Sequence, residues 1–180
     1  MPPLLFHFSD DPAIELFVPR VVRTPAKRSP GREWLNGPLV WAIDDWHQPM
    51  YLFPRDCPRI LLWRTPQTVA ADAQVYFGAS TARMLAYVEE GWADAISTAT
   101  LYRYELPPTP FESLDDAGMW VSRSEVRPLR RTEIGDLAAE LRAASVELRT
   151  LPDLTPLKGT WNTSLHASGI RLRNAVSWNE

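Results

Sequence analysis

The chain has 180 residues, of which 45% are hydrophobic and 23% are charged, and its net charge is −3. This length and composition predict one globular domain with a substantial core. The small negative charge gives no reason to expect nucleic acid or an anionic membrane as the main partner.

The N-terminal third of the sequence is predicted to consist of strands joined by long loops. Short apolar runs bounded by turn residues predict strands over 4–8, 14–18, 39–43 and 60–63. Residues 23–38 are rich in proline, glycine and basic groups and show no sustained periodicity. We expect this segment to be a mobile loop over a cleft, because loops of this length are often functional.

The rest of the sequence is predicted to contain two helices among further strands. Apolar residues recur at three- and four-residue steps over 80–96 and again over 134–144, which predicts amphipathic helices. Alternating or compact apolar segments predict strands over 100–106, 119–122, 125–129, 146–151 and 170–176. Strands therefore dominate, and the predicted class is α+β with mixed or antiparallel sheets and few helices.

The domain limits follow from the same pattern. Residues 1–157 are predicted to form a single α+β domain, and the turn-rich residues 158–180 a C-terminal tail that contributes one added strand. There is no internal repeat and no low-complexity tract.

The cysteine content and the apolar runs bear on the compartment. Cys57 is the single cysteine, which excludes an internal disulfide framework and fits a reducing environment. No stretch approaches the length of a membrane span, and the N-terminus lacks a signal-peptide pattern. Arginine greatly outnumbers lysine, which indicates a GC-rich bacterial genome. We expect a protein of the bacterial cytoplasm that does not enter a membrane.

Several common catalytic patterns are absent from the sequence. It has no G-x-G-x-x-G or P-loop, no G-x-S-x-G elbow, and no HxH, CxxC or HExxH spacing. No metal cofactor is therefore expected. A thiol nucleophile needs at least a cysteine and a histidine, which Cys57 and His47 could supply. A lone cysteine in a proline-rich turn is more often a packing residue, and we predict that role for Cys57.

The first predicted strand ends in a polar pair, His7 and Ser9, which share one face because side-chain direction in a strand repeats every two residues. A core histidine that hydrogen-bonds a loop is one interpretation of His7. A second comes from a resemblance. The segment LFHFSDDPAIELFVPR is similar to the first segment of the ADP-ribosyltransferase superfamily, whose members often begin with a strand ending His-x-Ser or His-x-Thr.

The later segments follow the same order as in that superfamily. LVWAID resembles its second strand, Tyr51 lies a few residues beyond it, TLYRYELP resembles a later core strand, and MWVSRSEVRPL resembles the segment with the acidic third motif. The stretches LFHFS, GREWLNGPLVWAID and WHQPMYLFPRDCPR are similar to those of uncharacterised bacterial proteins. The resemblance covers about the first 130 residues and implies an ADP-ribosyltransferase-like fold.

The resemblance also implies a reaction and a set of roles. A NAD-dependent enzyme of this kind cleaves the bond between nicotinamide and ribose, and positive charge develops on the ribose as in glycoside cleavage. Glu125 is implied as the catalytic carboxylate that stabilises this charge. His7 would bind the adenosine ribose, Ser9 would orient the nicotinamide end, and Tyr51 or Trp46 would stack on the ring. NAD is thus the expected co-substrate, and the acceptor is not specified.

Two alternatives remain open at this stage. The chain is either such an enzyme or a non-catalytic module of the same fold that binds another small ligand or a protein. Glu125 also fits an exposed, salt-bridged strand face. Four basic residues lie near Glu125 in the sequence: Arg123, Arg127, Arg130 and Arg131. The simplest interpretation is that they form a solvated strand face, and the alternative is that they bind an anion.

Overall fold

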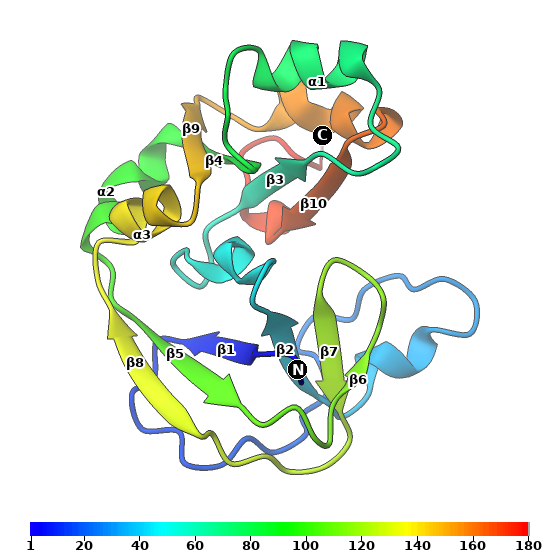
Figure 1. Cartoon of the computed structure of the whole chain (residues 1–180), viewed down its shortest axis with the longest axis vertical. Coiled ribbons are helices and arrows are strands. Elements are labelled where there is room, and N and C mark those ends of the chain that lie inside the picture. The colour runs from blue at the N-terminus through cyan, green and yellow to red at the C-terminus, as the bar shows by residue number, and fades with distance from the viewer. Residues whose placement is uncertain (180) are drawn as a thin grey trace. The chain divides into compact units, whose positions relative to one another are not determined.

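The structure, a computed structural model of the chain, describes residues 1–179. The chain has an α+β fold with two sheets, as the sequence pattern predicted (Figure 1). It divides into two compact units, each made of two separate segments. The first unit comprises Met1–Gln48 and Leu101–Glu133, and the second comprises Pro49–Thr100 and residues 134–179.

The sheet of the first unit has six strands in the order β6-β7-β2-β1-β5-β8 (Figure 1). The central strand β1 pairs antiparallel with β2 on one side and β5 on the other. The strands are β1 (Leu5–Ser9), β2 (Val40–Asp44), β5 (Leu101–Leu106), β6 (Glu112–Ser113), β7 (Met119–Ser122) and β8 (Arg130–Ile134).

One face of this sheet packs on a hydrophobic cluster. In the register of β1 and β5, Leu5 lies opposite Leu106 and His7 lies opposite Tyr104, so these side chains share a face. Leu5, Tyr104 and Leu106 belong to one buried cluster, which the loop residues Phe17, Phe111 and Val126 complete. Phe17 and Val126 also pair through their backbones. The His-x-Ser face of β1 is therefore the face that packs on the core of the unit.

The sheet of the second unit has four strands in the order β10-β3-β4-β9. They are β3 (Arg59–Trp63), β4 (Met84–Glu89), β9 (Val146–Leu151) and β10 (His166–Ile170). β3 pairs antiparallel with both neighbours, whereas β4 and β9 run parallel. Every residue of β3 and β4 is buried, which matches their nearly continuous apolar sequences.

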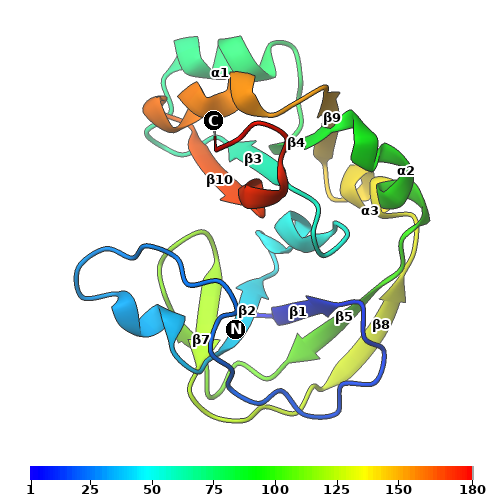
Figure 2. The same ribbon diagram turned by 180° about the vertical axis from the view of Figure 1, so that it is seen from behind.

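Three α-helices lie in the second unit among residues 1–179: α1 (Ala70–Phe77), α2 (Ala93–Thr98) and α3 (Leu137–Ala143). Phe77 of α1 packs on β3 and β4 together with Leu157, which lies in the 3-10 helix η4 (Thr155–Asn162). Helices α2 and α3 lie side by side (Figure 2). The other 3-10 helices are η1 (Glu33–Asn36), η2 (Gln48–Tyr51), η3 (Glu90–Trp92) and η5 (Leu172–Asn174). None of the helices in the described part of the chain has the length and apolarity that a membrane crossing requires.

The helix predicted over 80–96 is wrong. Residues 84–89 form β4, followed by η3 and then by α2, which begins at Ala93. The apolar run Met84–Val88 is buried on both faces, so it needs no helical period. The sequence pattern could not distinguish the two, because a short apolar run fits a buried strand as well as a helix.

Other predicted elements also differ from the structure. The strand expected at 125–129 is a single bridge at Val126, and the ordered strand β8 begins at Arg130. The helix expected from residue 134 begins at Leu137, after Asp136, whose side chain accepts a hydrogen bond from the Ala139 N–H and caps the helix. Residues 158–179, expected as a tail with one strand at 170–176, contribute β10 (His166–Ile170) to the second sheet, and Leu172–Asn174 form η5 instead of a strand. The strand expected at 14–18 is a single bridge at Phe17. The domain limits stay a prediction.

The loop over 23–38 is fastened to the first unit. It contains η1, whose Leu35 is 3% exposed and packs with Leu39 and Val121. Arg32 donates a hydrogen bond to the Leu114 carbonyl at 3.0 Å, and the Arg123 guanidinium lies over the Trp34 ring. The end of this segment is therefore part of the core rather than a free flap.

Candidate functional site

The five residues predicted for the site lie in both units. His7 and Ser9 are on β1, Trp46 follows β2, and Glu125 follows β7, all in the first unit. Tyr51 ends η2 and belongs to the second unit. Their roles in binding or catalysis stay predictions.

His7 is half-buried and its ring is held on two sides. Nδ1 lies 2.9 Å from the carbonyl oxygen of Trp41 on β2, so Nδ1 carries the proton and donates it. The ring packs against Phe17 with its centroid 4.8 Å away. The backbone contact sets the tautomer and the orientation of the ring.

The Ser9 side chain is buried at the end of β1. It is 5% exposed, and its hydroxyl oxygen accepts a hydrogen bond from the Asp11 N–H at 3.1 Å. On the opposite face of β1, Phe6 is 6% exposed and Phe8 is half-buried. The hydroxyl of Ser9 therefore shapes the turn that follows the strand.

The exit of β2 holds an acid–histidine pair that the sequence interpretation missed. Oδ1 of Asp44 accepts hydrogen bonds from both the backbone N–H and Nδ1 of His47, each at 2.8 Å. The two side chains are 27% and 19% exposed. Burial alone would raise the pKa of Asp44, but these hydrogen bonds and the nearby imidazole lower it below its usual value. The exposed Trp46 ring packs edge-on against His47.

The loop before β7 closes over this pair in a strained conformation. Asp115, Ala117 and Gly118 all have positive φ, and the Gly118 carbonyl accepts a hydrogen bond from the Asp44 N–H at 2.9 Å. A Cβ atom on Gly118 would lie 2.3 Å from His47 Nδ1 and 2.7 Å from Asp44 Cγ. Only glycine fits here, and such strain often accompanies functional sites. An Asp three residues before a His at a strand exit was the available sequence signal.

The side chain of Glu125 is exposed and forms no hydrogen bond or ion pair with any residue in 1–179. The neighbouring arginines contact other groups. Arg123 pairs with Glu112 at 2.6 Å and Arg130 pairs with Glu105 at 2.7 Å. Arg131 donates to the Pro12 carbonyl. These arginines therefore contact groups other than Glu125.

Tyr51 lies beside a buried arginine in the second unit. Arg59 opens β3, is 3% exposed, and has its guanidinium 5.6 Å from the Tyr51 ring centroid and 5.1 Å from that of Phe53. Burial raises the pKa of Tyr51, and the charges of Arg59 and Arg171 oppose this shift. Sequence reasoning gave no role to Arg59, because a basic residue that opens an apolar strand carries no pattern of its own.

Cys57 is fully buried beside Arg59. Burial raises the pKa of its thiol to about 12, although the Arg59 charge acts in the opposite direction. A thiol in this state is protonated at neutral pH and cannot act as a nucleophile. The geometry agrees with the packing role predicted for Cys57.

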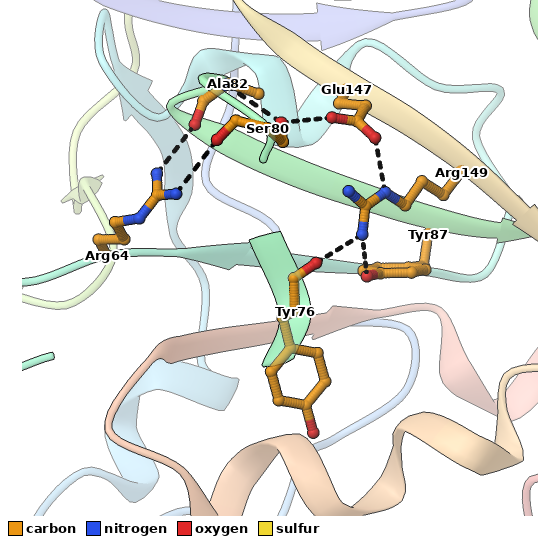
Figure 3. Close-up of polar contacts among 7 residues, drawn as sticks. All are labelled: Arg64, Tyr76, Ser80, Ala82, Tyr87, Glu147 and Arg149. Carbon is orange, nitrogen blue, oxygen red and sulfur yellow. Dashed lines mark hydrogen bonds and ion pairs between the residues drawn. The ribbon is translucent and has the colours of Figure 1, made fainter. Parts of the chain in front are cut away.

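A second polar network joins β4, β9 and α1 (Figure 3). The Arg149 guanidinium donates to Glu147 at 2.7 Å, to the Tyr87 hydroxyl at 2.9 Å and to the Tyr76 carbonyl at 2.6 Å. Ser80 donates to the other oxygen of Glu147, and Arg64 donates to the carbonyls of Ser80 and Ala82. Arg149 thus satisfies a carbonyl in the last turn of α1 and ties the helix to the sheet.

Within residues 1–179, no three His, Cys, Asp or Glu side chains are grouped so that they could hold a metal ion. The first unit holds an oriented imidazole at His47 and a fixed carboxylate at Asp44, and the second unit holds a buried guanidinium at Arg59.

The fold and these clusters define an α+β protein of two sheet-bearing units with polar groups held in fixed orientations. Residues 6–175 match the model of a family described as a family of unknown function, DUF6886, and the chain belongs to this family. The comparisons with curated proteins and with solved structures gave no match.

Proposed function

We propose that the chain has an ADP-ribosyltransferase-like fold and uses NAD, cleaving the bond between nicotinamide and ribose. The order of the motifs from LFHFS to MWVSRSEVRPL supports this proposal, as does the central position of β1 in the first sheet. A small-molecule dinucleotide is then the partner, and the reaction takes place in a bacterial cytoplasm. The acceptor stays undefined.

The observation that carries the proposal is the orientation of His7. Its Nδ1 proton is committed to the Trp41 carbonyl, so in the neutral ring Nε2 is the nitrogen that accepts a hydrogen bond. A ribose hydroxyl is a donor of the kind that this nitrogen takes. An imidazole that is held in one tautomer before binding avoids the cost of ordering it later.

The other predicted residues take roles consistent with their environments. Of the two aromatic candidates for stacking, Trp46 is 41% exposed and offers a ring face. Ser9 is buried, so it acts through the turn that it forms with Asp11 rather than by direct contact. Glu125 supplies the carboxylate that stabilises charge on the ribose.

The test measures NAD binding by calorimetry and nicotinamide release by chromatography, in the wild type and two variants. Glu125→Gln should bind NAD but lose nicotinamide release by about 100-fold or more, because charge stabilisation in the transition state commonly contributes that much. Glu133→Gln is the matched control, since Glu133 is also an exposed glutamate of the first unit. A wild type that neither binds NAD nor releases nicotinamide would overturn the proposal.

A second candidate function is a non-catalytic module that binds a small ligand or a protein. The exposed Glu125, which no described residue orients, favours it, because catalytic groups are usually held in place. NAD binding without nicotinamide release in the wild type would support this candidate and exclude the enzyme.

A further inference from the structure

Arg59 is a buried cation without a counter-ion. It is 3% exposed, and no carboxylate of residues 1–179 forms an ion pair with its guanidinium. Buried charges in proteins are normally paired, because removing an ion from water is costly. Burial lowers the pKa of Arg59 to about 10, so the side chain remains charged at neutral pH. The second unit therefore keeps an uncompensated positive charge in its interior.

Two of the three guanidinium nitrogens of Arg59 donate hydrogen bonds to backbone carbonyls, and these contacts fix the group in place. Nε donates to the Met50 carbonyl at 2.8 Å and Nη1 donates to the Cys57 carbonyl at 3.0 Å. Within residues 1–179, Nη2 donates to no protein group, and the one buried side-chain polar atom without a partner is Trp41 Nε1. Nη2 is thus the one nitrogen of the guanidinium from which no described residue accepts a hydrogen bond.

A second arginine follows the strand that pairs with the start of β3, since β10 places Ile170, the residue before Arg171, opposite Arg59. Arg171 is half-buried, and its positive charge acts to lower the pKa of both Arg59 and Tyr51. Its backbone lies in the left-handed region at φ 58°, and Nε donates to the Arg55 carbonyl at 3.3 Å. Two like charges that approach each other repel, so an anion bound by both would relieve the repulsion.

From this geometry we propose that Arg59 and Arg171 form a binding site for a phosphate group in the second unit. Nη2 of Arg59 donates one hydrogen bond to the anion, and Arg171 supplies the second charge. Guanidinium groups suit phosphate oxygens because they present several donors in a fixed plane. The site stands whether or not NAD is used, since it takes any accessible phosphate, free or carried by a nucleotide.

The experiment titrates the full chain with inorganic phosphate, pyrophosphate and NAD at constant ionic strength. It records the thermal midpoint and, by calorimetry, the affinity. Arg59→Gln is the direct variant, but it removes donors from two backbone carbonyls and can fail to fold. Arg171→Gln is therefore the deciding variant, and Arg173→Gln, an exposed arginine nearby, is its matched control.

Phosphate and pyrophosphate should raise the thermal midpoint of the wild type. Arg171→Gln should weaken their affinity about tenfold or more, as expected for a lost charge-assisted contact, and Arg173→Gln should leave it within about twofold. A wild type that responds to neither anion, or an Arg171→Gln variant that responds as strongly as the wild type, overturns the site. Phosphate binding without NAD binding would contradict the proposed function and support the phosphate site.

Discussion

Replacing Gly118 by alanine tests whether the Asp44–His47 pair and the loop above it form one unit. The substitution has two separable costs. Alanine at φ 71° suffers the left-handed penalty of about 1–2 kcal/mol. Its Cβ would also lie 2.3 Å from His47 Nδ1 and 2.6 Å from Cγ, so the imidazole must leave Asp44.

The second cost follows from the environment of the pair. Both side chains are less than a third exposed, so the hydrogen bond between them is only partly screened. A hydrogen bond to a charged group contributes about 1.5–3 kcal/mol. The loop cannot simply move away, because the Gly118 carbonyl is bonded to the Asp44 N–H. We expect Gly118→Ala to lower the free energy of unfolding by about 2.5–5 kcal/mol in total.

The first unit offers a matched control in Gly31, which has φ 83° and where an added Cβ atom would meet no other atom within 4 Å. Gly31→Ala should therefore cost only the backbone penalty of about 1–2 kcal/mol. Urea unfolding at pH 7 measures both variants. In a His47→Ala background the extra cost of Gly118→Ala should shrink, because the imidazole atoms it meets are gone. Equal costs for the two glycine variants in the wild-type background would refute the reasoning.

Six strands were predictable because their apolar runs are short and bounded by turn residues. β1, β2, β3, β5, β7 and β9 all lie within two residues of their predicted limits. β4 was not predictable as a strand, since its burial on both faces depends on β3 and β9, which are distant in sequence. Helix α1 was missed for a related reason. The Val69 N–H at its start bonds to the hydroxyl of Ser164, far along the chain.

The candidate site was less predictable than the fold. A sequence shows that His7 and Ser9 share a face of β1, but not which face packs on the core, because that choice depends on Phe17 and Val126 crossing over the sheet. Trp46 lies beside His47 in the first unit. The contacts of its neighbours depend on Gly118, which lies far away along the chain. Arg59 shows the same limit, since its lack of a carboxylate partner is a property of the folded chain.

Three further predictions concern individual side chains. Cys57 should react with a thiol reagent at pH 7 about three orders of magnitude more slowly than a free thiol, because its pKa is about 12, and labelling kinetics of the folded protein check this. Arg149→Met should cost about 2–3 kcal/mol in urea unfolding because it frees the Tyr76 carbonyl and the Glu147 carboxylate, whereas the exposed Arg142→Met should cost little; equal costs would contradict the network. The last prediction is a pH dependence. The folded-state pKa of Asp44 is lowered, so its pair with His47 contributes stability that is fully present above the unfolded pKa of about 3.9 and is lost as the pH falls through the folded pKa. Asp44→Asn should therefore cost about 1.5–3 kcal/mol at pH 7, and its difference from the wild type should shrink below about pH 4. Asp45→Asn is the control, because Asp45 is exposed and accepts its hydrogen bond from the Gln48 side chain. Urea unfolding from pH 7 to pH 3 measures both, and an Asp44→Asn difference that stays constant over this range would show that the carboxylate charge does not stabilise the β2 exit.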